Sequence, residues 1–105
     1  MSWMYLLTAG VLEVIWAYSM KQSLGFTRLT PSLVTLAAMG ASFWLLALAM
    51  RSLPLGLAYS IWVGIGAIGA FLVGIAWLGE PANALRLVAA ALIVAGLILM
   101  ALSSS

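Results

Sequence analysis

The sequence contains no cysteine and no histidine, and it has four basic and two acidic residues among 105. Without cysteine the chain forms no disulfide bonds, and without either residue it lacks the usual ligands of transition metals. The basic residues stand singly along the chain, so no basic patch indicates a nucleic-acid partner. No nucleophile–base pair is recognisable either, so we expect neither an enzyme nor a protein with a cofactor.

Hydrophobic residues dominate what is present, at 67% of the chain. Soluble domains use about 25% charged residues, so this chain has too little polar surface to face water. A helix that spans a bilayer needs about 20 mainly apolar residues, and the sequence predicts four such helices, at about 3–20, 31–50, 55–78 and 85–102. We therefore predict an all-α integral membrane fold in which residues 1–105 form one four-helix transmembrane domain.

The basic residues give little bias to the orientation of these helices. Lys21, Arg28 and Arg86 would face one side of the membrane, and Arg51 would face the other together with the N-terminal amine. Positive charge in short loops sets orientation, and here the two sides differ by about one charge. So small a difference permits insertion in both directions, although charge counting alone equally allows one preferred orientation.

Glu13 is the one charged residue near the middle of a predicted span. An Asp at the centre of a spanning helix costs about 2.5–3.5 kcal/mol on insertion scales, and no Lys, Arg or His lies inside another span to offset such a cost. One interpretation is a permanently protonated acid that hydrogen-bonds helices together. The favoured interpretation is a binding site for a cation and for protons that faces a wet cavity.

Helical spacing places Gly10 and Trp16 on the same face as Glu13. Gly10 leaves room beside the carboxylate, and the Trp16 indole can donate a hydrogen bond to it. Both residues are therefore predicted to support binding at Glu13.

The second and third predicted spans add a hydroxyl and two aromatic groups. Ser42 is a small hydroxyl at depth, while Tyr59 and Trp62 are three residues apart and share one helix face. Combined with Glu13, these groups would make a compact site for a flat or quaternary cation, which aromatic faces attract. Ordinary packing against helices or lipid is the alternative for the two aromatic residues.

Glycine is frequent in the third predicted span. Gly66, Ala70 and Gly74 form a stripe of small residues at four-residue spacing, which lets membrane helices approach closely. Gly64, close to Gly66, would weaken the helix and allow a bend. We predict helix packing or a hinge for these four residues, and the stripe is also a plausible seam between copies of the chain.

Four segments together carry a resemblance to a known family. They are residues 10–17 (GVLEVIWA), 25–32 (GFTRLTPS), 52–56 (SLPLG) and 58–66 (AYSIWVGIG). Over essentially its whole length the chain resembles the small multidrug resistance transporters. The tryptophan three residues after the glutamate resembles the guanidinium exporter branch of that family.

This resemblance implies an antiparallel homodimer of dual topology, in which Glu13 from both subunits forms one site for the substrate or protons. Trp16 and Ser42 resemble the family's hydrogen-bond partners of that carboxylate. Tyr59 resembles its switching tyrosine, and Trp62 resembles a wall of its binding site.

The implied function is a proton-coupled antiporter that exports guanidinium and small substituted guanidinyl cations across the bacterial inner membrane. Val63, where this branch often has threonine, would make the site more apolar and leave room for alkylated ions. A broad-specificity exporter of quaternary ammonium or lipophilic cations is therefore an alternative. A small structural subunit of a larger membrane complex is an alternative of another class.

Overall fold

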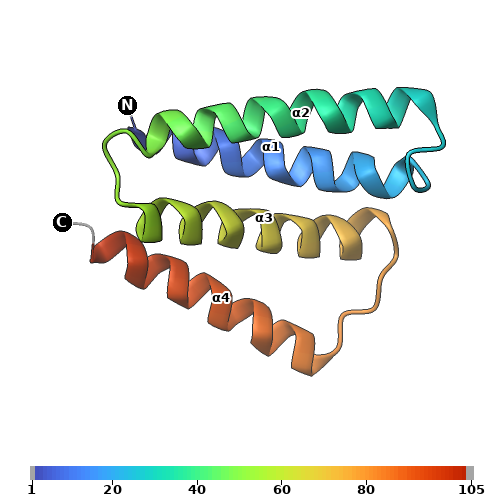
Figure 1. The fold of residues 1–105 in the computed structure, drawn as a ribbon. Coiled ribbons are helices and arrows are strands. Elements are labelled where there is room, and N and C mark those ends of the chain that lie inside the picture. Colours follow the sequence, from blue (N-terminus) through green and yellow to red (C-terminus); the bar gives the residue numbers. More distant parts are fainter. Residues whose placement is uncertain (1, 104–105) are drawn as a thin grey trace.

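A computed structural model describes residues 2–103, which form four α-helices joined by short connections (Figure 1). The helices are α1 (Ser2–Gln22), α2 (Leu29–Ala49), α3 (Leu55–Trp77) and α4 (Ala84–Leu102). All four are long and apolar enough to cross a membrane, with lengths from 19 to 23 residues. The prediction of four apolar helices of spanning length is thereby confirmed.

Local chemistry explains where the helices begin and end. α2 begins at Leu29, so Pro31 lies in its first turn. Proline is tolerated there because backbone N–H groups in the first turn have no acceptor within the helix. At the start of α4 the Asn83 side chain caps the helix by accepting the Arg86 backbone N–H at 2.8 Å. Gly79 has a φ of +68° just beyond α3, a conformation that favours glycine.

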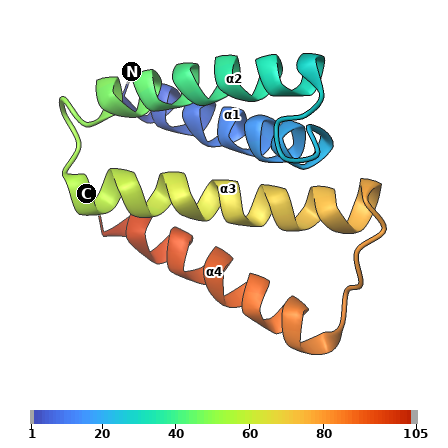
Figure 2. The same cartoon turned by 45° about the vertical axis from the view of Figure 1, so that its right-hand side comes forward.

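α1 lies between α2 and α3 and packs against both, whereas α4 contacts only α3 among the described helices (Figures 1 and 2). α1 and α2 form an antiparallel pair. α4 starts away from α3 beside the connection at residues 78–83 and approaches it toward the C-terminal end (Figure 2). No residue of α4 is buried.

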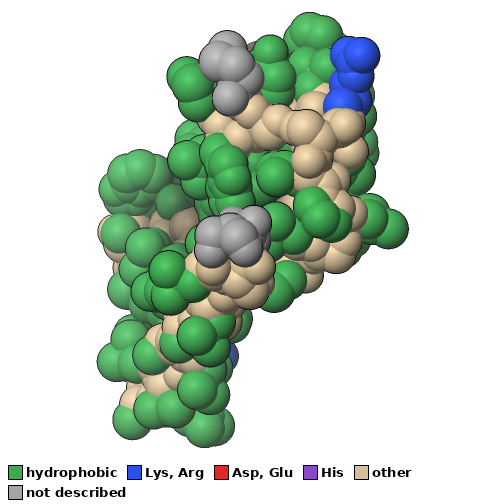
Figure 3. Space-filling view, turned by 90° about the vertical axis from the view of Figure 1, so that its left-hand side faces the viewer, with side chains coloured by type: hydrophobic (Ala, Val, Ile, Leu, Met, Phe, Trp, Pro, Cys, Tyr) green, Lys and Arg blue, Asp and Glu red, His purple; other side chains and the backbone are tan. Residues whose placement is uncertain are grey.

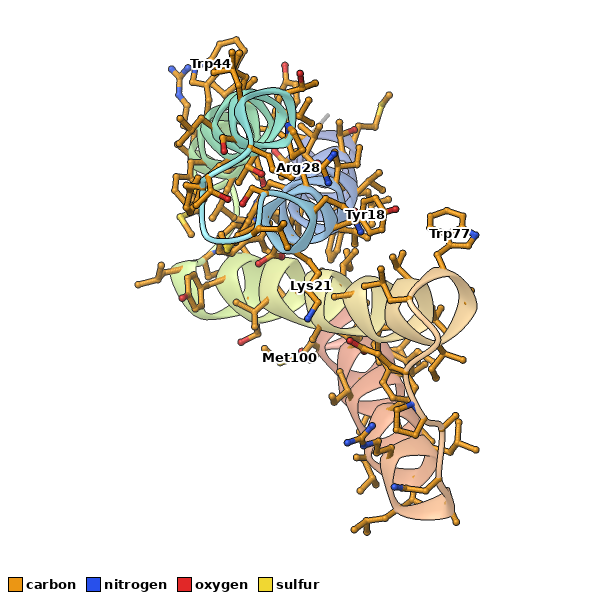
Figure 4. All side chains as sticks on the ribbon, turned by 90° about the vertical axis from the view of Figure 1, so that its right-hand side faces the viewer. Tyr18, Lys21, Arg28, Trp44, Trp77 and Met100 are labelled. Atoms are coloured by element: carbon orange, nitrogen blue, oxygen red, sulfur yellow. The ribbon has the colours of Figure 1, made fainter. Side chains whose placement is uncertain are left out.

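The four helices form a thin slab of 43 × 35 × 16 Å. The thinnest dimension is less than half of either of the other two. An end view shows the same arrangement, with α3 crossing beneath the α1–α2 pair and α4 extending away from it (Figure 4).

The buried core lies where α1, α2 and α3 meet. It consists of Leu6 and Ala9 from α1, Leu46 and Ala49 from α2, and Ala58, Ile61 and Trp62 from α3. The face seen in Figure 3 is largely apolar, and all four helices carry exposed large hydrophobic side chains. Such a surface suits a lipid environment, in which apolar side chains need no cover.

Candidate functional site

Glu13 extends from the middle of α1 toward α3, where its carboxylate lies against the backbone of Gly66. A Cβ atom added at Gly66 would overlap Oε1, Cδ and Cγ of Glu13. Oε1 is buried and has no hydrogen-bond partner within residues 2–103. The carboxylate is therefore held at depth with an acceptor atom that no neighbouring donor satisfies.

Two further contacts set the register of α1 on α3. A Cβ atom at Gly10 would approach Ile65 to within 2.6 Å, and one at Gly69 would overlap Val14. Each glycine thus makes room for a side chain of the opposite helix. Gly10 lies one turn before Glu13 on α1, and Gly69 lies one turn after Gly66 on α3. The small residues bring the two backbones close, which is why the carboxylate reaches α3.

Ser42 and Trp62 form a buried polar pair between α2 and α3. Ser42 is fully buried, and its hydroxyl donates to the Ala9 carbonyl at 2.6 Å while accepting the Trp62 indole N–H at 3.0 Å. The Ser42 hydroxyl therefore donates its proton to the α1 backbone, one turn before Glu13. In a single chain Ser42 supports Trp62 and α1 rather than the carboxylate.

Four aromatic rings form a continuous row from α1 across α2 to α3. Phe43 packs edge-on against Trp16, with ring centroids 6.4 Å apart, and against Trp62 at 5.7 Å. Tyr59 continues the row at 5.6 Å from Trp62. The Trp16 indole N–H is buried and has no acceptor among residues 2–103. The predicted hydrogen bond from Trp16 to Glu13 is therefore not formed within residues 2–103 of a single chain.

Phe43 is the member of this row that sequence reasoning missed. Nothing distinguishes it from other apolar residues of its span except its position next to Ser42. Its ring is about half exposed, at 47%, although it contacts two tryptophans. The row therefore presents an aromatic face to the outside of the single chain as well as to its interior.

Tyr59 and Val63 lie on the side of α3 that faces α4. Both are exposed, and they line a groove of about 500 Å³ together with Gly96, Leu97 and Met100 of α4. Gly64 lines the same groove, and a Cβ atom there would overlap Leu97. α3 runs as one helix through Gly64, so this glycine provides close packing here while its role as a hinge stays a prediction.

The rest of the small-residue stripe lies toward the far end of α3. Ala70 and Gly74 line a pocket of about 200 Å³ with Tyr18 and Lys21 of α1. The stripe therefore meets different partners along its length, because Gly66 contacts Glu13 whereas Gly74 meets Glu80. Within residues 2–103 no group of three possible metal ligands occurs.

Glu13, with its unpaired oxygen, stands three residues before Trp16 on α1, and Trp16 is the first ring of the aromatic row. Charge and aromatic faces are the two features that attract a cation. Cations are attracted to the faces of such rings within about 6 Å. The groups predicted to act together come from α1, α2 and α3, and α4 contributes none of them.

The whole chain can be compared with known proteins. Residues 1–93 match the sequence profile of the Small Multidrug Resistance protein family. The chain is 55% identical over 104 residues to a protein of Yersinia pseudotuberculosis named guanidinium exporter, which covers 99% of this chain and 100% of that protein. It is 56% identical over 104 residues to proteins of the same name from Escherichia coli K12 and Salmonella typhimurium, with 99% of each chain covered. The chain therefore belongs to the Small Multidrug Resistance family of multi-pass membrane transport proteins.

Proposed function

We propose that this chain exports guanidinium and small substituted guanidinyl cations across the bacterial inner membrane in exchange for protons. The observation that carries the proposal is the Glu13 carboxylate, held at mid-helix against Gly66 with one oxygen unpaired. The names of the similar proteins support the substrate class. Residues 1–105 act as one transmembrane domain in this proposal.

The chemistry of guanidinium explains why a carrier is needed. Its charge is that of the arginine head, whose pKa is above about 12, so it stays cationic and cannot cross lipid unaided. A carboxylate matches its planar donor geometry because two parallel N–H groups can bind both oxygens. Trp16 and Trp62 would add aromatic surface for the flat ion.

A second copy of the chain would complete the site. In one chain the aromatic row is partly open to the outside, because Phe43 and Tyr59 are about half exposed. An antiparallel homodimer would place a second Glu13 opposite the first, and the small difference in basic charge between the two ends agrees with insertion in both orientations. This gives the inverted two-fold arrangement that larger transporters build from internal repeats.

Exchange follows if protons and the cation compete for the same carboxylates. Protons that enter from outside would neutralise the two Glu13 side chains and permit the dimer to turn inward. A cytoplasmic cation would displace these protons and be carried outward. Trp16 and Ser42 would orient the carboxylates, with Gly10 leaving room beside them. Tyr59 and Trp62 would change position or partner as the dimer turns, and Val63 would set the size of substituent that the site accepts.

Substrate-evoked current in proteoliposomes tests this function. Wild-type protein is compared with Glu13→Gln for guanidinium, methylguanidinium, phenylguanidinium and tetraethylammonium. We expect wild-type protein to give currents with the guanidinyl ions. In Glu13→Gln these currents should fall to the background of empty liposomes, because a neutral amide neither releases a proton nor balances the charge of the cation. Tetraethylammonium current as large as that of guanidinium would instead favour the broad-specificity exporter.

Glu80→Gln is the matched control, since it makes the same chemical change at the chain's other acidic residue, outside the helices. The guanidinium current of Glu80→Gln should stay above the background of empty liposomes, whereas that of Glu13→Gln should not. No current for any cation from folded wild-type protein would contradict the proposal and favour a structural subunit.

A further inference from the structure

Glu80 is the chain's only acidic residue besides Glu13, and it lies in the connection between α3 and α4. Its backbone N–H donates to the Gly74 carbonyl at 3.0 Å, and the Leu78 N–H donates to the same carbonyl at 3.2 Å. Gly79, between them, takes the positive φ that reverses the chain. The connection is thereby folded back so that Glu80 faces the last turns of α3.

The Glu80 side chain occupies the space that Gly74 leaves open. A Cβ atom at Gly74 would overlap Oε1 of Glu80 and lie 3.0 Å from its Cδ. Glu80 also lines the pocket of about 200 Å³ to which the end of α1 contributes Tyr18 and Lys21. Lys21 extends from α1 toward α3 in the end view (Figure 4). The carboxylate thus lies over a glycine, and Glu80 shares a pocket with Lys21 of another helix.

Glu80 also borders a second, larger space, of about 570 Å³, between the diverging ends of α3 and α4. Arg86 of α4 lines this space together with apolar residues such as Phe71 and Ile93. Glu80 therefore lines both the pocket that Lys21 of α1 borders and the space that Arg86 of α4 borders. The Arg86 guanidinium itself donates to the Pro81 carbonyl of the same connection at 2.9 Å. The helix that carries Arg86 is the one that packs least tightly against the rest of the molecule.

We propose that Glu80 is a positioning residue that latches the α3–α4 connection to the end of α1. Seated over Gly74 toward Lys21, it holds this end of α1 against α3. Turned toward Arg86, it releases the connection and lets α4 move relative to α1. The proposal rests on the proposed function, because exchange across a membrane requires each end of the site to open and close in turn. Glu80 does not contact Glu13, so the latch acts on the rate of opening and not on cation affinity.

A distance measurement tests the latch without any transport assay. The chain has no cysteine, so Gln22→Cys and Ala82→Cys can be spin-labelled selectively at the end of α1 and in the connection. Labelled protein is diluted with unlabelled protein in liposomes, so that each distance lies within one chain. We expect Glu80→Gln to shift the distance distribution to longer values or broaden it. An unchanged distribution in Glu80→Gln would overturn the latch.

Gly74→Ala gives a second, independent test, since the added methyl group takes the place of the carboxylate. It should produce the same change in distance as Glu80→Gln. The matched control is Gly40→Ala, where a Cβ atom meets nothing within 4 Å. If Gly74→Ala does not fold, Glu80→Gln decides alone, because it removes charge without adding volume.

The kinetic consequence can be measured on the same proteins. We expect the guanidinium exchange rate of Glu80→Gln to change by about two- to fivefold, the range that one exposed ion pair supports, with affinity unchanged. Exchanging the charges, Lys21→Glu with Glu80→Lys, should restore the rate. A change in affinity as large as the change in rate, or no restoration by the exchange, would overturn the pairing. Absence of transport in the wild type would refute the proposed function while leaving the distance test of the latch intact.

Discussion

α1 and α4 show opposite relations between composition and burial. α4 contains the stretch of highest mean hydropathy among the four helices, yet none of its residues is buried. α1 is the least apolar and carries Glu13, yet it lies between α2 and α3. In a water-soluble protein the order would be reversed, because the most apolar helix would be the most deeply buried.

The difference shows what determines burial when lipid is the solvent. Lipid tails are as apolar as leucine, so apolar surface alone gives a helix no reason to leave the membrane. α1 is held instead by close approach at Gly10 and Gly69 and by the hydrogen bond from Ser42 to Ala9. α4 has one comparable contact, where Leu97 fits over Gly64 of α3. Small residues and polar groups, more than hydrophobicity, therefore position helices here.

The largest effect we expect separates these two regions by stability. Leu6→Ala truncates a fully buried side chain of α1 and leaves a cavity, which costs about 2–5 kcal/mol in protein cores. Leu92→Ala makes the same change on α4, where the side chain is 69% exposed. It should change the free energy of unfolding by less than about 0.5 kcal/mol.

Denaturation by SDS in mixed micelles, followed by tryptophan fluorescence, measures both values in monomeric protein. Equal destabilisation by the two variants would contradict the comparison and show that α4 is packed as tightly as α1. If Leu92→Ala destabilises only the dimer, the exposed face of α4 is an interface between two chains.

The sequence was sufficient for the four helices because each is a long apolar run with clear punctuation. Pro31 marks the first turn of α2, and Pro54 immediately precedes α3. It was less informative about which residues touch. Gly66 was predicted only for helix packing or a hinge. Its contact with Glu13 depends on the register of α1 on α3, and the periodicity of one helix does not specify that register.

The second expected effect tests this contact in the well-packed region. Gly66→Ala would force the Glu13 carboxylate from its position, so we expect the guanidinium exchange rate to fall by about 10- to 100-fold, equivalent to about 1.4–2.7 kcal/mol. Gly69→Ala is the matched control, because its added methyl group would overlap Val14. Val14 is an apolar side chain of α1, the helix that carries Glu13. If both variants lose activity equally, the exchange rate depends on the spacing between α1 and α3 and not on the position of the Glu13 carboxylate.

Hydrogen-bond partners were the other feature that the sequence left open. Ser42 was predicted as a hydrogen-bond partner of the Glu13 carboxylate, but its partners in a single chain are the Ala9 carbonyl and the Trp62 indole. Three donors or acceptors on three helices can be paired in several ways, and only the packing of the helices selects one. Phe43 was missed for the same reason, because its importance comes from two tryptophans that are distant in sequence.

The smallest expected effect concerns this buried pair. Ser42→Ala removes both hydrogen bonds and leaves the indole N–H of Trp62 without its acceptor in a buried place, so we expect a loss of about 1–2 kcal/mol in unfolding free energy. Ser60→Ala is the control, since Ser60 is an exposed hydroxyl of α3 and lines the groove beside α4. Trp62 fluorescence should shift only in Ser42→Ala, and that shift would link the loss of stability to the indole. Because α1 is bonded through Ala9, the same variant should also loosen the helix that carries Glu13, and guanidinium affinity should weaken in parallel with stability. A stable Ser42→Ala protein with unchanged affinity would mean that the glycine contacts alone hold α1 in place.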